Sequence, residues 1–135
     1  MKIIICWSNN KGIAFHQRRV SRDAAVIADI KSLLGQQPLY IHPASQILFG
    51  ESGIDLVCSE SYLSDANDND YVFIESDAYL SFEDDIRQII AYNWNRDYPA
   101  DTYFRMDLSA FEQVDSTILP GHSHENIQRE IWNRL

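Results

Sequence analysis

The chain has 135 residues, a length typical of one domain, and we expect residues 1–135 to fold as a single domain. Apolar residues make up 45% of it and charged residues 23%, a globular composition that excludes intrinsic disorder. The net charge is −9, and no apolar run approaches the roughly 20 residues that a membrane-spanning helix needs.

The first half of the chain alternates strand-like and helical patterns. Residues 2–7 predict a buried strand, and residues 13–17 predict a second strand that pairs with it in an N-terminal hairpin. We expect a helix from Ser21, as its cap, to Gly35, where it stops. Further strands are predicted over 38–42, 54–59 and 71–76, with short helical segments over 43–50 and 60–66.

The second half begins with "SFEDDIRQIIAYNWN", residues 81–95, which predicts a helix capped by Ser81. Residues 102–108 and 111–119 alternate apolar and polar side chains, as an antiparallel strand pair would. Ile127, Ile131 and Leu135 recur at every fourth position and predict a final helix. The expected fold is therefore α/β (or α+β): a single-layer mixed sheet of about five to seven strands, opened by the hairpin and packed with three or four helices.

Charge is distributed unevenly along the chain. Residues 1–31 contain six bases against two acids, residues 32–86 contain eleven acids and no base, and residues 87–135 contain five bases and seven acids. The acidic block would repel a phosphate backbone and favours a basic partner. We therefore expect no direct contact with nucleic acid or with a membrane.

Metal and redox chemistry have weak support in the sequence. Asp65, Asn67 and Asn69 resemble the start of a calcium-binding loop, but Asp70 stands where such a loop needs glycine and Ser76 where it needs glutamate. Cys6 and Cys58 are too far apart for a Cys-x-x-Cys motif and indicate free, buried thiols in a cytoplasmic protein. We expect no bound metal and no cofactor.

"GHSHENI", residues 121–127, gathers His122, His124 and Glu125. Two histidines with a carboxylate form a known metal-ligand set. The same residues also suit the start of a helix, where Ser123 would cap the first turn and Glu125 would face the positive end of the helix dipole.

Two more stretches are candidates for binding. Arg18, Arg19 and Arg22 could hold phosphate or RNA, or could pair with the protein's own acids, which we favour. "YNWNRDYPAD", residues 92–101, mixes aromatic and arginine side chains, as interface anchors or the edge of a core would.

The hairpin followed by "RRVSRD", together with "YNWNRDYPAD" and "SHENIQREI", resembles small immunity proteins of bacterial contact-dependent growth inhibition systems, of the kind paired with ribonuclease toxins. The resemblance implies a non-catalytic cytoplasmic protein that neutralises its cognate toxin in a one-to-one complex. It agrees with the acidic block, since carboxylates can mimic phosphates in a basic nuclease cleft.

Our hypothesis from the sequence is an acidic immunity protein, not an enzyme, that binds a basic nuclease toxin. The expected toxin-binding residues are all acids of the middle block: Glu60, Asp65, Asp68, Asp70, Glu75, Asp77, Glu83, Asp84 and Asp85. The alternative is a small RNA-processing hydrolase that uses His122, His124 and Glu125. A third possibility is a regulatory or scaffold domain in which the charge serves solubility.

Overall fold

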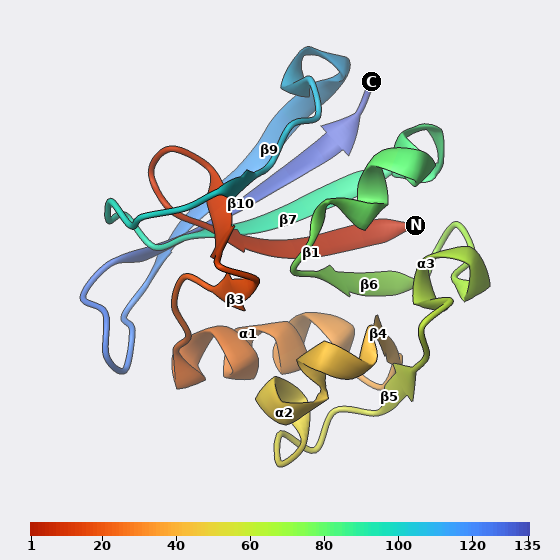
Figure 1. Ribbon diagram of the computed structural model, residues 1–135, viewed down its shortest axis with the longest axis horizontal. Helices are drawn as coiled ribbons and strands as arrows, with labels where there is room; N and C mark the ends of the chain where they lie inside the picture. The colour runs from red at the N-terminus through yellow and green to blue at the C-terminus, as the bar shows by residue number, and fades with distance from the viewer.

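The computed structural model describes residues 1–135 and contains a seven-stranded mixed sheet (Figure 1). The strand order is β5-β4-β6-β1-β7-β10-β9; the first five strands run parallel, and β10 and β9 are antiparallel additions. The bounds are β1 Lys2–Trp7, β4 Leu39–Ile41, β5 Leu56–Cys58, β6 Tyr71–Ile74, β7 Gln88–Asn93, β9 Phe111–Leu119 and β10 Ile127–Arg134. This arrangement confirms the predicted fold class.

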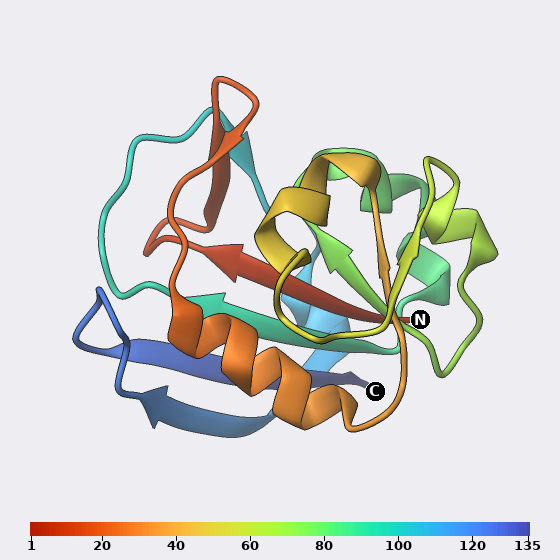
Figure 2. The ribbon, with the colours of Figure 1, turned by 90° about the horizontal axis from the view of Figure 1, so that it is seen from below.

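Helical segments cover both faces of the sheet. The α-helices are α1 Ala24–Leu34, α2 Gln46–Phe49 and α3 Tyr62–Asp65, and the 3-10 segments are η1 Pro43–Ser45, η2 Asp77–Asp85 and η3 Leu108–Ala110. Helix α1 packs on one face, through Val26, Ile30 and Leu34, and Figure 2 shows it lying against the strands. None of the helices has the length and hydropathy needed to span a lipid bilayer.

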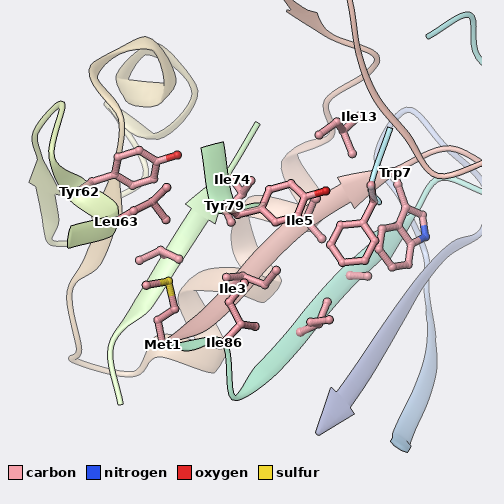
Figure 3. Close-up of a cluster of buried hydrophobic side chains, with 14 of the residues drawn as sticks. Met1, Ile3, Ile5, Trp7, Ile13, Tyr62, Leu63, Ile74, Tyr79 and Ile86 are labelled. Carbon is pink, nitrogen blue, oxygen red and sulfur yellow. The ribbon is translucent and has the colours of Figure 1, made fainter. Parts of the chain in front are cut away.

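Strand β1 forms the centre of the core because its side chains are buried on both faces. Ile3, Ile5 and Trp7 point toward η2 and α3, where Figure 3 shows them grouped with Tyr79 and other apolar side chains. Ile4 points to the opposite face and packs in the cluster that contains α1. The continuous apolar sequence Ile3-Ile4-Ile5 is what a parallel strand covered on both sides requires.

Two predicted helices are wrong. Most of residues 88–93 are buried between β1 and β10 and form β7, so only the first part of the predicted helix over 81–95 is helical, within η2. The predicted final helix is β10, paired with β7 and β9. Residues four apart share a face of a strand as well as of a helix, so the spacing of Ile127 and Ile131 fits both structures.

A second, three-stranded sheet has the order β3-β2-β8, with β2 Gly12–Phe15, β3 Arg18–Arg19 and β8 Thr102–Tyr103. The N-terminal hairpin therefore joins β2 to β3, with His16 and Gln17 at positive φ, and does not join β2 to β1 as predicted. The predicted pair over 102–108 and 111–119 is also wrong, since β8 pairs with β2 and β9 pairs with β10.

Candidate functional site at the carboxyl ends of the parallel strands

The connections of the sheet diverge around β1. From β1 the chain runs through α1 to β4, and from β6 it runs through η2 to β7 on the other side of β1. In open α/β sheets, ligands bind outside the carboxyl ends of the strands at such a switch point. A cleft of about 1020 Å³ lies there, between the segment that precedes α1 and the ends of β4 and β6. This cleft is the candidate site.

Three arginines line the cleft, and only one of them is paired with an acid. Arg19 binds Glu75 through two hydrogen bonds of 2.6 and 2.8 Å, and the hydroxyl of Ser45 donates a third to Glu75 at 2.7 Å. The bond to Glu75 raises the pKa of Arg19. Arg18 and Arg22 take part in none of the five ion pairs of the protein. Internal pairing was thus predicted for all three arginines and holds for Arg19 alone.

A narrow apolar cavity adjoins the cleft and shares four residues with it: Arg19, Ser21, Arg22 and Glu75. Its volume is about 20 Å³, room for about one water molecule. Trp94 forms part of its wall, is 2% exposed, and carries a buried indole N–H with no acceptor. A buried donor without a partner is costly and rare in native proteins.

Asp23 joins the start of α1 to the loop that precedes β10, and these two segments lie side by side in Figures 1 and 2. Its carboxylate caps α1 by accepting from the amide of Ala25 at 2.8 Å. It also accepts from the amides of His122, Ser123 and His124 at 2.8, 2.7 and 3.1 Å. We call this set of contacts the Asp23 clasp. It shows that Asp23, and not Ser21 as predicted, caps the helix.

The clasp keeps Asp23 ionised. Burial alone would raise its pKa, but the amide donors and His124 stabilise the carboxylate and lower the pKa from its usual value. Gly121 lets the loop close, because a Cβ at this position would collide with the carbonyl oxygen of His124. The side chain of Asp23 is fully shielded from solvent.

His124, 8% exposed, lies between Asp23 and two hydroxyl groups. Its Nδ1 is 3.0 Å from Asp23 Oδ2, while its Nε2 is 2.7 Å from Ser21 Oγ and 3.1 Å from the hydroxyl of Tyr98. An ionised carboxylate only accepts hydrogen bonds, so Nδ1 carries a proton, and in the neutral imidazole the single lone pair of Nε2 faces the two hydroxyls. The ring of Trp94 packs against the imidazole at a centroid distance of 4.7 Å.

Other features predicted from the sequence, in this loop and elsewhere, differ from the structure. His122 and Glu125 are exposed, and Ser123 contributes only its amide to the clasp, so the expected helix cap is absent. No group of three or more His, Cys, Asp or Glu side chains is arranged to hold a metal ion. The two cysteines are free, but Cys58 is exposed and not buried as predicted.

The predicted acidic contact residues lie in three settings. Asp68, Asp70 and Asp85 gather near Met1 at the amino end of β6, and Glu60, Asp65, Glu83 and Asp84 are exposed on α3, on η2 or beside them. Glu75 and Asp77 lie beyond the carboxyl end of β6, where Arg19 and Arg105 bind them. About five residues of extended chain, roughly 16 Å, separate Asp70 from Glu75.

Sequence reasoning missed the pairing of Ser21, Asp23 and His124. Ser21 was interpreted as a helix cap, and His124 as part of a metal-ligand set or of a helix start. About a hundred positions separate the two segments, and no local motif marks residues so far apart. Only the sheet topology, which brings β10 back beside β7, indicates that its preceding loop reaches the start of α1.

No protein-family model and no curated protein sequence matches the chain. Among solved structures it is similar to dihydrofolate reductase from Enterococcus faecalis complexed with NADP(H) and RAB-propyl, with a TM-score of 0.69 and 13% sequence identity. The likeness covers 98% of this chain and 95% of that one. The protein thus belongs to the α/β proteins with a crevice at the switch point of the sheet. Its particular fold is that of dihydrofolate reductase.

This likeness overturns the function expected from the sequence. A full-length match to the fold of an enzyme contradicts the immunity-protein resemblance, the one-to-one complex with a basic nuclease toxin, and the expectation that the chain is not an enzyme. The alternative RNA-processing hydrolase has no support either. Two of the short motifs that suggested the immunity family instead build the fold here: "RRVSRD" leads into α1, and "SHENIQREI" enters β10.

Proposed function

We propose that the chain is an enzyme of the dihydrofolate reductase fold that binds a small substrate bearing a carboxylate or phosphate group in the cleft. The observation that carries this proposal is that Arg18 and Arg22 line the cleft without acidic partners. Guanidinium groups match the geometry of carboxylate and phosphate and bind both with charge-assisted hydrogen bonds. The position of the cleft at the switch point supports the same assignment. We place the enzyme in the cytoplasm because both cysteines are free thiols.

NADP(H), with which the Enterococcus faecalis protein is complexed, does not fit the residues of this cleft. Pyrophosphate sites use glycine-rich turns and exposed amides at helix starts. Here the carboxylates of Glu75 and Asp77 follow β6 on either side of Ser76, and all three residues line the cleft. We therefore derive no hydride-transfer step for this chain.

Calorimetric titration tests the proposal with three probes: inorganic phosphate, dihydrofolate and NADPH. We expect phosphate or the carboxylates of dihydrofolate to bind. Replacing both arginines (Arg18→Ala with Arg22→Ala) should weaken binding about 10²- to 10⁴-fold, since each of the two arginines loses a charge-assisted hydrogen bond that contributes about 1.5–3 kcal/mol. Arg87→Ala is the matched control, because this exposed arginine lies beside Met1 at the amino ends of the strands.

Two results would contradict the proposal. One is that neither phosphate nor dihydrofolate binds the folded protein. The other is that binding survives unchanged in the double arginine variant. NADPH oxidation in the presence of dihydrofolate, followed by absorbance, tests the activity that gives the fold its name. Measurable turnover would show that the protein does bind NADP(H) and that our exclusion of this cofactor is wrong.

A further inference from the structure

We propose that Ser21, His124 and Asp23 form a nucleophilic triad that hydrolyses a carboxylic ester through an acyl-enzyme. The inference rests on the proposed function for the place of the substrate, which is the cleft that Ser21 lines. The reactivity of Ser21 depends on the triad alone.

The arrangement has the three contacts that define such a triad. A nucleophile must lie within hydrogen-bond reach of a base, and a third group must orient that base. Ser21 Oγ lies 2.7 Å from His124 Nε2, and His124 Nδ1 lies 3.0 Å from Asp23 Oδ2. Asp23 is shielded from solvent and kept ionised by the clasp, so it fixes the tautomer in which Nε2 accepts a proton.

The surroundings give the triad access to substrate on one side only. Ser21 is partly exposed and lines both the cleft and the narrow cavity, whereas Asp23 and His124 are buried. Arg22, which follows Ser21, can bind an anionic group of the acid or of the alcohol.

The reaction needs only an ester and water. Ser21 Oγ bonds to the carbonyl carbon while its proton moves to His124 Nε2, and the alcohol then leaves with that proton as its bond to the carbon breaks. A water molecule next adds to the acyl carbon and gives a proton to Nε2. The bond from the carbon to Oγ breaks, this proton returns to Ser21, and the carboxylic acid is released. Nothing is oxidised or reduced.

A purely structural role for the same contacts makes different predictions. Asp23 joins two segments whatever Ser21 does, and a clasp needs no reactive hydroxyl. Tyr98 also approaches Nε2, but at 3.1 Å compared with 2.7 Å for Ser21, so Ser21 makes the closer contact. A structural clasp would therefore lose stability on mutation while Ser21 reacted no faster than any exposed serine.

Diisopropyl fluorophosphate, which modifies activated serines, distinguishes the two roles by intact mass and peptide mapping. We expect one adduct on the native protein, at Ser21, and none in Ser21→Ala. His124→Gln should slow labelling by about 10²- to 10⁴-fold, the contribution of a general base. Ser109→Ala is the control, because Ser109 is exposed on η3 and should leave the labelling unchanged.

Each outcome decides for or against the triad. If the folded native protein takes up no label at Ser21, or if folded His124→Gln is labelled at the native rate, the triad is overturned. Circular dichroism and a melting curve establish that each variant is folded. If His124→Gln fails to fold, the labelling rate of Ser21 is compared with that of the exposed Ser109 in the native protein, and equal rates overturn the triad. Labelling at Ser21 without binding of phosphate or dihydrofolate would refute the proposed function and leave the triad standing.

Discussion

The acids at the two ends of β6 differ in their surroundings. Asp70, just before the strand, lies with Asp68 near Met1 on an open surface. Glu75, just after the strand, accepts from Arg19 and Ser45 beside the cleft. Asp23, the acid with the largest number of donors, belongs to the basic N-terminal block. The comparison teaches that the density of charge along a sequence does not locate a functional site. The hydrogen-bond donors that the fold brings around a carboxylate do locate one.

The largest effect is expected from Asp23→Ala. This change removes the cap of α1 and leaves the loop amides of His122, Ser123 and His124 without their acceptor. Loss of a cap costs about 1 kcal/mol, and a buried donor left unpaired, here the amide of His124, costs about 1–3 kcal/mol, whereas the amides of the exposed His122 and Ser123 can turn to water. We expect the free energy of unfolding, measured by urea denaturation, to fall by about 3 kcal/mol.

Asp68→Ala is the matched control at the other end of β6, because Asp68 is exposed and accepts no hydrogen bond in the structure. It should change the free energy of unfolding by less than about 0.5 kcal/mol. Equal effects of the two substitutions would mean that the clasp contributes nothing.

Acid should destabilise the folded protein through the clasp, because protonation of Asp23 breaks the contacts that the carboxylate makes. The pKa of Asp23 is lower in the folded protein than in the unfolded chain. Its contribution to stability is therefore complete above the unfolded value of about 3.9 and is lost as the pH falls through the lowered folded value. In Asp23→Asn this loss should be absent, so the slope of stability against pH below about pH 4 should be shallower than in the native protein.

Urea unfolding at a series of pH values measures that slope. Asp68→Asn serves as the control and should keep the native pH dependence. If Asp23→Asn and the native protein follow parallel curves, the carboxylate does not hold the charge that the clasp assigns to it.

The fold class was predictable from the sequence, and the reasons are local. Ile3-Ile4-Ile5 and the run over 71–74 are too short for helices and too apolar for an exposed strand. The failures occurred where burial between strands outweighs the helical pattern, as at β7, or where one spacing fits two structures, as at β10. The expectation of a single domain stays a prediction.

The site was less predictable because its members are brought together by topology. The sequence located the arginines before α1 and the histidines before β10 as candidates, but each set was interpreted within its own segment. Their meeting depends on β10 adding to the sheet beside β7, in antiparallel register. Predicting β10 as a helix removed the basis for placing His124 near Ser21.

The ion pair between Arg19 and Glu75 should have an intermediate effect. Both side chains are mostly buried, at 25% and 19% exposure, and Ser45 also donates to the carboxylate. Glu75→Gln keeps the shape and removes the charge, and it should lower the free energy of unfolding by about 1.5–3 kcal/mol, the range of hydrogen bonds to charged groups. A double-mutant cycle with Arg19→Gln isolates the coupling, and a coupling near zero would show that the pair is not formed in solution.

The smallest effect is expected from relieving the charge near Met1. Burial lowers the pKa of the terminal amine, while the nearby carboxylates, Asp68 first, raise it. Replacing Asp68 with Asn should therefore lower the pKa of the amine further, which a titration of the amine followed by NMR would detect. Asp55→Asn, an acid before β5 that is not among the groups acting on the amine, is the control. An unchanged pKa of the amine in Asp68→Asn would show that solvent screens the charge of Asp68 from the amine of Met1.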